Sequence, residues 1–498
     1  MRFMFHFRKI VFPLFMATAL LCSCSQADDD TAGNGDKEKT QEQYNVVFQL
    51  QSNSSSMTRS VEDSYNHVQG TADEYKVNVA RAYFFDSKTK LLSKSAPLTG
   101  ITYNGTNASG NVIYEAEPIS VPMGTYDIFV IANTNRQFKK DKEDEFLADI
   151  DSLSYVQAVV EDISGGIIMS NRASENLGTV ISKKNDNDVN VVSITLERVL
   201  ARLDVAKAEE TFELTDDKGE KYASVTLDGY YIVNLPKYYY TFRHTAVLTT
   251  LEEPQWDVNT NFGNVSDVNG YVIDPYFFQK TIDAAAFANA DKYYERFSAN
   301  YSNPDYVKWD TFNAVSATPN YKTIYCLENC TLAPAQKNGY STGVLFKAIL
   351  EPNNNVYTLN SAGALVLVTD KQSYPETLYF FQQKFYASAD ALAAAVVASG
   401  LSTGKYQARK FEKTDDGYRC YYKYWIRHLD NNSPGEMGVM EFGIVRNNLY
   451  RMLITGVSDL GDGGSIIDPN TPDEGETYLK VVLNVKPWTV RDLTNIVL

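Results

Sequence analysis

The stretch that decides the fold is YNVVFQL, at residues 44–50. Its larger apolar side chains, Tyr44, Val46, Phe48 and Leu50, fall on every second residue. Side chains of a β-strand alternate between the two faces of a sheet, so these four share one face. The stretch therefore predicts a strand with one apolar face.

The same alternation recurs along the chain, first in YKVNVARAYFFD at residues 75–86. The chain has 34 tyrosines and 25 phenylalanines, and such aromatic richness favours strands. Asn104-Gly105, Asp228-Gly229 and Asp416-Gly417 predict turns between strands. Further strands are expected at residues 119–121, 126–131, 191–196, 200–205, 224–233, 344–350, 377–381, 438–445, 450–454 and 478–485.

Helical patterns are few. Residues 281–297 and 388–399 are predicted as helices, the second with Asp390 near its start and Gly400 just past its end. Many short strands with two inserted helices indicate a mainly β fold built from antiparallel β-sandwiches.

The chain is long enough for two or three domains, and we place a boundary near residue 206. An N-terminal β-sandwich is expected at 60–205 and a larger one at 206–498. The charged segment 207–220 is a connection between them or a long hairpin. Residues 459–476 form an acidic loop that lacks the spacing of a calcium-binding loop, which favours a flexible surface loop.

The N-terminus has the pattern of a lipoprotein signal peptide over residues 1–23. A basic start is followed by an apolar run at 10–21, too short for a permanent membrane span. Cys24 is the expected lipid-bearing residue, since Cys22 directly follows the large side chain of Leu21. The alternative is an uncleaved apolar tail or a core helix.

Composition excludes one class of partner and limits the cysteine chemistry. A net charge of −16 leaves no basic patch for nucleic acid.

Besides Cys22 and Cys24 there are Cys326, Cys330 and Cys420. In a straight strand the first two of these would lie about 13 Å apart, which favours free thiols over a local bridge.

No motif for catalysis is found. His67, His244 and His428 lie in no metal-ligand spacing, and nucleotide, zinc-protease and serine-hydrolase motifs are absent. We therefore expect no enzymatic activity, no cofactor and no metal. A hydrolase with an unrecognised carboxylate pair stays open, because such pairs need only proximity in space.

Four segments resemble the FimA/Mfa-type fimbrillins of Bacteroidales, the subunits of type V pili. They are LERVLARLDV (196–205), IYCLEN (324–329), GIVRNNLYRMLITGV (443–457) and YLKVVLNVKPW (478–488). The resemblance implies two transthyretin-like β-sandwich domains and export of the precursor as a lipoprotein. It also implies trimming by an arginine-specific protease and polymerisation by donor-strand exchange.

Carried onto this chain, the resemblance places the cut between Arg59 and Ser60, in a serine-rich segment. The leader 24–59 then contains the removable first strand, with Tyr44, Val46, Phe48 and Leu50 on its apolar face. Arg81 lies inside a strand pattern, where a protease has poor access. The alternative for Arg59 is an ordinary loop arginine.

The donor strand is expected at the C-terminus, in TVRDLTNIVL at 489–498. Val490, Thr494, Ile496 and Leu498 share one face of this segment, and Asp492 interrupts that face. The alternative is a final strand that docks on its own domain.

These features predict a structural subunit of a cell-surface fimbrium that supports adhesion, with a precursor anchored by lipid to the outer membrane. Its partners would be further copies of the chain, related fimbrial subunits and the protease. An anchor or tip subunit is the nearest alternative. A glycan-binding surface lipoprotein is another, since aromatic faces stack on sugars.

Overall fold

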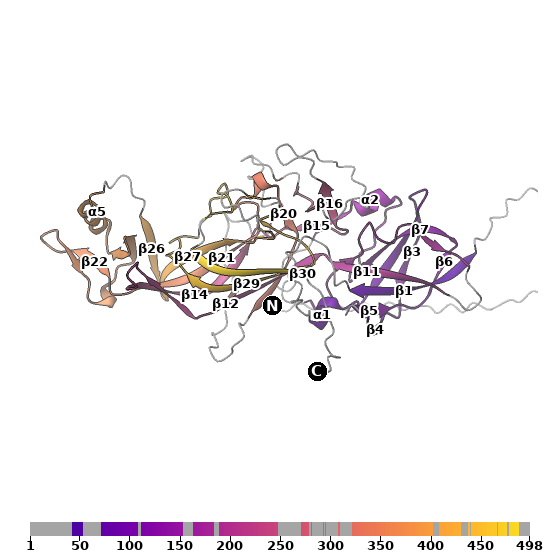
Figure 1. Cartoon of the computed structure of the whole chain (residues 1–498), viewed down its shortest axis with the longest axis horizontal. Helices are drawn as coiled ribbons and strands as arrows, with labels where there is room; N and C mark the ends of the chain where they lie inside the picture. Colours follow the sequence, from indigo (N-terminus) through magenta and orange to yellow (C-terminus); the bar gives the residue numbers. More distant parts are fainter. Residues whose placement is uncertain are drawn as a thin grey trace, which may run out of the picture. The chain divides into compact units, whose positions relative to one another are not determined.

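The computed structural model describes residues 42–52, 71–107, 111–152, 163–183, 189–247, 270–277, 280, 292, 294, 307–308, 321–401, 408–429, 437–438, 440–465, 467–475 and 478–487. Residues 42–498 cluster as one compact unit. Strands dominate it, and the helices are short (Figure 1). No helix in the described ranges is long and apolar enough to cross a membrane.

The N-terminal strands form one curled ten-stranded sheet in the order β3-β2-β7-β9-β11-β1-β5-β4, with β10 beside β7 and β6 beside β1. Two short helices, α1 (Ala72–Tyr75) and α2 (Glu143–Leu147), accompany it. The strands are β1 (Gln43–Ser52), β2 (Ala80–Asp86), β3 (Leu92–Leu98), β4 (Thr102–Thr106), β5 (Val112–Glu115), β6 (Ile119–Pro122), β7 (Gly124–Ala132), β9 (Met169–Ser170), β10 (Thr179–Ile181) and β11 (Asn190–Arg198).

This sheet encloses an aromatic core. The ring of Phe84 on β2 lies 5.9 Å from Phe48 and 5.7 Å from Tyr126, edge to face in both cases. Alternate residues of the same strand, Tyr83 and Phe85, point to the opposite face and pack against Phe146 of α2. Both faces of β2 are thus buried, which explains its nearly continuous apolar run.

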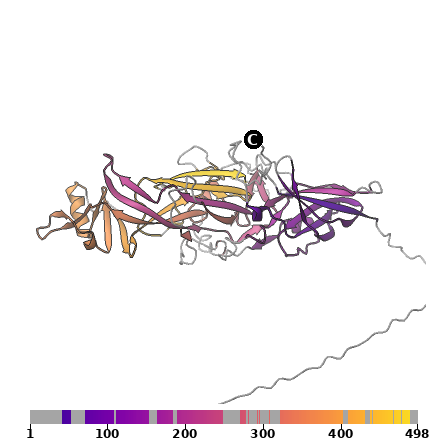
Figure 2. The same ribbon diagram turned by 90° about the horizontal axis from the view of Figure 1, so that it is seen from below.

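The C-terminal strands form two sheets that pack face to face. A four-stranded sheet has the order β19-β12-β29-β30, and the two yellow strands of Figure 2 are its C-terminal members β29 and β30. A ten-stranded sheet has the order β13-β14-β21-β27-β26-β24-β25-β22-β23, with β18 beside β14. The first comprises β12 (Leu200–Lys207), β19 (Lys322–Leu327), β29 (Asn448–Val457) and β30 (Leu479–Pro487). The second comprises β13 (Thr211–Thr215), β14 (Lys221–Val233), β18 (Val307–Lys308), β21 (Gly343–Pro352), β22 (Val356–Leu359), β23 (Leu365–Leu367), β24 (Thr377–Phe381), β25 (Lys384–Tyr386), β26 (Arg409–Thr414) and β27 (Gly417–Trp425).

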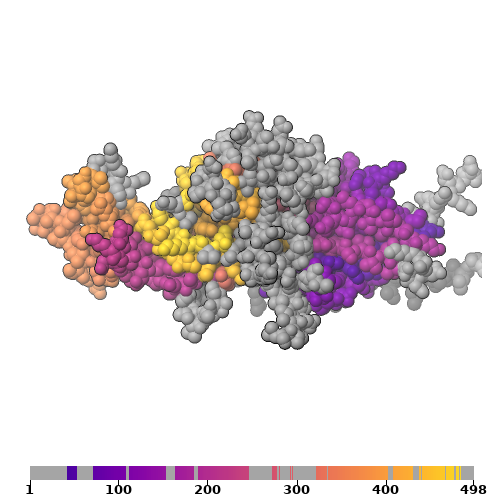
Figure 3. Space-filling model, viewed as in Figure 1, coloured from indigo at the N-terminus to yellow at the C-terminus, as the bar shows by residue number. Residues whose placement is uncertain are grey.

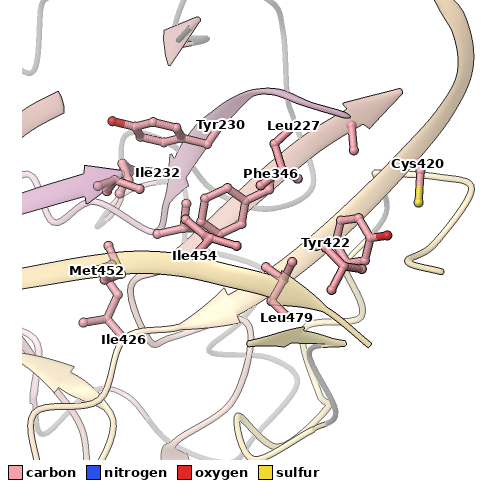
Figure 4. Close-up of a cluster of buried hydrophobic side chains, with 14 of the residues drawn as sticks. Leu227, Tyr230, Ile232, Phe346, Cys420, Tyr422, Ile426, Met452, Ile454 and Leu479 are labelled. Atoms are coloured by element: carbon pink, nitrogen blue, oxygen red, sulfur yellow. The ribbon is translucent and has the colours of Figure 1, made fainter. Parts of the chain in front are cut away.

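The core between these sheets is apolar. Tyr230 and Phe346 from the larger sheet meet Met452, Ile454 and Leu479 from the smaller one (Figure 4). The remaining elements are small. They are the pairs β8 (Ile150–Ser152) with β15 (Tyr238–Tyr240), β16 (His244–Val247) with β17 (Gly270–Ile273) and β20 (Asn329–Cys330) with β28 (Gly443–Ile444), the 3₁₀ turns η4 (Ala333–Ala335) and η5 (Lys371–Ser373), and the helix α5 (Ala389–Ala398).

The predicted fold class, mainly β sandwiches with few helices, is confirmed. Helix α5 falls where the pattern at 388–399 predicts it, and the Ser388 side chain caps its start. The helix predicted at 281–297 lies outside the described residues except for Lys292 and Tyr294. The domain boundary near residue 206 stays a prediction; β12 (Leu200–Lys207), which spans it, pairs with the C-terminal strands β19 and β29.

Two predicted turns are wrong. Asn104-Gly105 and Asp228-Gly229 lie inside β4 and β14, at points where the strand register shifts. A glycine in a strand interior marks a bulge as readily as a turn, and the local sequence does not separate the two. Asp416-Gly417 does form the turn between β26 and β27.

The strand predicted at 438–445 is also largely wrong, since within the described residues of that range the strand is limited to Gly443–Ile444, preceded by an isolated bridge from Phe442 to Arg427. The three cysteines of the described part are free and buried, as the spacing of Cys326 and Cys330 favours. Burial raises the pKa of the Cys420 thiol to about 12, so it stays protonated at neutral pH.

The acidic segment 459–476 is a surface loop only in part: Asp462, Asp468 and Asn470 are exposed, but other residues of the segment are not. Leu460, Ile467 and Asp473 are buried. A Cβ atom on Gly461 would lie 2.1 Å from the carbonyl oxygen of Tyr421, so this chain segment runs directly against a strand backbone. Composition suggests solvent exposure, but the close approach that glycine allows brings the segment into the core.

Asp473 places a carboxylate in the buried part of this segment. Its side chain is 2% exposed, and no described residue gives either carboxylate oxygen a hydrogen bond of normal geometry. Burial raises the pKa of Asp473 well above the usual carboxyl range, and the nearby Ser341 hydroxyl acts in the opposite direction. The side-chain oxygen Oε1 of Gln336, opposite Asp473 beside the bridge Lys337–Pro472, also has no donor among the described residues, whereas the Gln336 carbonyl accepts from the Asp473 N–H at 3.2 Å.

We expect the substitution Asp473→Asn to raise the melting temperature at neutral pH. A raised folded-state pKa costs stability as pH rises from the usual carboxyl range through that pKa, and an amide removes this cost. The gain should therefore shrink towards pH 4. Thermal melts from pH 4 to 8 test this against Asp415→Asn, an exposed carboxylate in a turn. A melting temperature that falls in Asp473→Asn at neutral pH would contradict it.

Candidate functional site

The strand β1 lies inside its sheet, paired along both edges. Residues Val46 to Ser52 run parallel to Asn190 to Leu196 of β11. On the other side β1 pairs antiparallel with β5 and, nearer its start, with β6. Figure 1 shows β1 between β11 and β5, and the space-filling view shows violet and magenta side chains of this region closely packed (Figure 3). Taking β1 out would expose two rows of unpaired backbone groups.

The inward face of β1 is fully buried. Val46, Phe48 and Leu50 are each 0% exposed and pack with the core that contains Phe84. Tyr44 is half-buried at the start of the strand, and its hydroxyl donates to Glu42. Three buried apolar side chains, at roughly 1.5–3 kcal/mol each, contribute about 4–9 kcal/mol to holding the strand.

The inward face ends on a polar contact. Ser52 is 1% exposed and follows Leu50 on the same face. Its hydroxyl accepts a hydrogen bond of 3.2 Å from Nη2 of Arg198, the last residue of β11. Arg198 is itself fully buried, and burial lowers its pKa to about 10, which leaves it charged at neutral pH.

The same guanidinium group reaches two other elements. Its Nε donates to the Glu74 carbonyl at 2.7 Å, and its Nη1 donates to Asn447 Oδ1 at 2.9 Å. Glu74 is on α1, and Asn447 directly precedes β29. Arg198 therefore joins the end of β1, the helix α1 and the C-terminal sheet.

The Glu74 carboxylate forms a second buried junction. It is 0% exposed and accepts hydrogen bonds from Arg202 Nη1 at 2.8 Å and from the Tyr325 hydroxyl at 2.7 Å. Burial and the Glu74 charge raise the pKa of Tyr325, so its hydroxyl stays a donor. The other carboxylate oxygen accepts from the backbone N–H of Thr71 at 2.7 Å. The helix that follows β1 in the described chain is thus tied to β12 and β19.

The structure describes only part of the predicted site. Tyr44, Val46, Phe48 and Leu50 lie on β1 as expected. The other predicted residues, namely Cys24, Arg59, Ser60, Val490, Thr494, Ile496 and Leu498, lie outside the described residues.

Sequence reasoning missed three residues of the site, Ser52, Glu74 and Arg198. Ser52 continues the alternation of 44–50 by one more inward position. Arg198 is one of four charged residues among the apolar ones at 196–205, with Glu197, Arg202 and Asp204, which signals that buried partners are required there but does not single out Arg198. Glu74 gives no comparable signal, because its partners are distant in sequence.

The described histidines are embedded in the fold. Burial lowers the pKa of His244 to about 3 and that of His428 to about 4. His428 Nδ1 lies 2.7 Å from the Tyr450 hydroxyl. In the described part of the chain, no three His, Cys, Asp or Glu side chains gather in a way that could hold a metal ion.

One cavity of about 1050 Å³ is lined by aromatic and charged residues, among them Arg409, Tyr421 and Trp425. The two aromatic side chains are only 8% and 5% exposed. Arg409 donates to Asp459 at 2.8 Å. Little of either aromatic ring is therefore open to solvent.

Two parts of the chain match profiles of fimbrial proteins. Residues 46–200 match the family described as major fimbrial subunit protein (FimA). Residues 416–494 match the family described as major fimbrial subunit protein type IV, fimbrillin, C-terminal. No curated protein matches the chain.

Solved structures with related folds come from Bacteroidales. A fimbrilin (FimA) from Porphyromonas gingivalis W83 is 16% identical, with 90% of this chain and 98% of that one covered and a TM-score of 0.43. A candidate cell adhesion protein from Parabacteroides distasonis ATCC 8503 is 15% identical, with 90% and 97% covered and a TM-score of 0.43. The tip fimbrial protein Mfa3 from Porphyromonas gingivalis is 10% identical, with 90% and 100% covered and a TM-score of 0.35.

The two profile matches show that residues 46–200 and 416–494 are similar to regions of major fimbrial subunits, as the resemblance of the sequence predicts.

We expect Glu74→Ala to lower the free energy of unfolding by about 1–3 kcal/mol, because the buried Tyr325 hydroxyl loses its acceptor and Arg202 loses one of its two carboxylate partners, keeping only Asp204. Asp73→Ala is the matched control. Asp73 lies on the same helix, half-exposed and 4.0 Å from Lys76, so its loss should cost at most about 1 kcal/mol. Urea denaturation of the full chain measures both. Equal costs for the two variants would show that the buried junction adds nothing to stability.

Proposed function

We propose that the chain is a stalk subunit of a cell-surface fimbrium, exported as a lipoprotein, trimmed after Arg59 and polymerised by donor-strand exchange to support adhesion. The observation that carries this proposal is the position of β1. It is the first described strand, yet it lies in the sheet interior with partners on both sides.

A cut after Arg59 would separate β1 covalently from the rest of the sheet. Residues 53–59 join the strand to the cut, so the whole of β1 belongs to the leader 24–59. Its departure opens a groove whose floor is apolar and whose edges are the free backbone groups of β11 on one side and of β5 and β6 on the other. An incoming strand satisfies both at once, as in other β-augmentation complexes.

The chain also has a suitable donor. Residues 489–498 follow β30, which lies at the edge of the four-stranded sheet. The apolar face of Val490, Thr494, Ile496 and Leu498 resembles the inward face of β1. Burying such a strand supplies several kcal/mol before the entropy cost of association, enough to hold subunits without covalent links.

The proposed partners are further copies of the chain, related fimbrial subunits and an arginine-specific protease. The precursor is proposed to be held on the outer membrane by lipid on Cys24. Cys24→Ala should abolish incorporation of labelled palmitate in the bacterium, whereas Cys22→Ala should retain it. Labelling that persists in Cys24→Ala would place the lipid elsewhere.

Limited digestion of residues 25–498 with an arginine-specific protease tests the polymerisation. We expect one early cut after Arg59, followed by SDS-resistant ladders. Arg59→Ala should block both, and deletion of 489–498 should leave the cut but remove the ladders. Arg81→Ala is the control, since Arg81 lies within β2 and should not be an early site.

The other outcomes distinguish the alternatives. A cut after Arg59 without ladders in the unaltered chain points to an anchor or tip subunit. A chain that resists cleavage and stays monomeric would overturn the proposal. Retention on polysaccharide would then favour a glycan-binding surface lipoprotein.

A further inference from the structure

The contact between Ser52 and Arg198 bears on which strand can best replace β1. The inward positions of β1 are apolar at 46, 48 and 50 and polar at 52, where the hydroxyl accepts from a fully buried guanidinium. Loss of β1 removes this acceptor. The guanidinium keeps its bonds to the Glu74 carbonyl and to Asn447, but the loss of one acceptor from a buried charged group still costs free energy, so a replacement strand with an acceptor at this position is favoured.

The C-terminal segment carries one. When it is laid antiparallel to β1, Leu498, Ile496 and Thr494 take the places of Val46, Phe48 and Leu50. Two residues further on, Asp492 takes the place of Ser52. The residue that interrupts the apolar face of the donor thus falls at the one inward position where a polar group is favoured.

We propose, on the basis of the function proposed above, that Asp492 of the donor strand pairs with Arg198 of the accepting subunit, and that this pair sets the direction and register of the inserted strand. A carboxylate forms a stronger, charge-assisted hydrogen bond to a guanidinium than a hydroxyl does. The pair therefore also favours the donor over the leader strand that it displaces.

Other alignments match the groove less well. The opposite face of the segment would place Asn495 at the Phe48 position and Arg491 beside Arg198, a contact of like charges. An antiparallel shift by two residues puts Thr494 at position 52, but it leaves the Val46 position empty.

Alignments in the same direction as β1 have their own faults. With Asp492 at position 46, 48 or 50, a carboxylate is buried among apolar side chains. With Asp492 at position 52, Lys486 would fall at the apolar position 46. Lys486 would then have to leave its pairing with Leu449 in the four-stranded sheet. With Asp492 at position 44, the strand fills the three apolar positions but ends before position 52 and offers Arg198 no side-chain acceptor.

Disulfide trapping between two copies of the full chain reads the register directly. In β11 the residues paired with 47, 49 and 51 of β1 are Val191, Ser193 and Thr195, whose side chains lie on the outward face. Asn495→Cys in the donor should link to Ser193→Cys in the acceptor after cleavage at Arg59. A link to Thr195→Cys instead would show the shifted register, and a link to Val191→Cys the same-direction strand. Either would overturn the proposal.

Binding of a labelled peptide of residues 489–498 to the cleaved full chain provides the energetic test. Asp492→Ala in the peptide should weaken binding about tenfold to hundredfold, as loss of a hydrogen bond to a charged group does. Asp492→Asn, which keeps an acceptor, should weaken it less. Asn495→Ala, on the outward face, is the control and should change it by less than about twofold.

The outcomes separate this inference from the function on which it rests. If the unaltered peptide binds and Asp492→Ala binds equally well, donor-strand exchange stands and the Asp492–Arg198 pair is wrong. If the unaltered peptide does not bind and the cleaved chain forms no ladder, the proposed exchange itself is wrong, and the pair with it.

Discussion

The structure around β1 depends on one buried charge, the guanidinium group of Arg198. It lies where three elements meet, and its three nitrogens donate to Ser52, to the carbonyl of Glu74 and to Asn447. A buried arginine is tolerated only where its donors are satisfied, so the elements that supply the acceptors must be held in place together. This constraint connects the removable strand to parts of the fold that would stay behind.

The two buried junctions have different parts in this arrangement. The Glu74 carboxylate joins α1 to β12 and β19 through Arg202 and Tyr325, and none of these contacts involves β1. They would survive the loss of the leader and keep the new N-terminal region attached. The Ser52 contact, in contrast, would be lost with the leader. The Glu74 junction would thus persist when the leader is removed, whereas Arg198 would exchange Ser52 for another partner.

Much of the fold was predictable from local patterns. Alternation at 44–50 gives β1 and its buried face, and the polar start and glycine stop at 388–399 give α5. Local patterns give wrong predictions where a glycine can mark a turn, a bulge or a close approach of two backbones. Asn104-Gly105 and Asp228-Gly229 mark bulges within strands, and the acidic segment 459–476 enters the core because Gly461 permits a close backbone approach. In each case the outcome depends on a neighbouring strand that is distant in sequence.

The sequence by itself determined which residues can form strands, which face of the first strand is apolar, and that a similar face recurs at the C-terminus. Periodicity is a local property, and the side-chain pattern carries it without reference to the rest of the chain. Only the tertiary structure decided that β1 lies between β11 and β5, and that Ser52 meets Arg198. Gln49 of β1 and Glu115 of β5 are 66 positions apart, and Ser52 and Arg198 are 146 apart; no local pattern specifies such pairings.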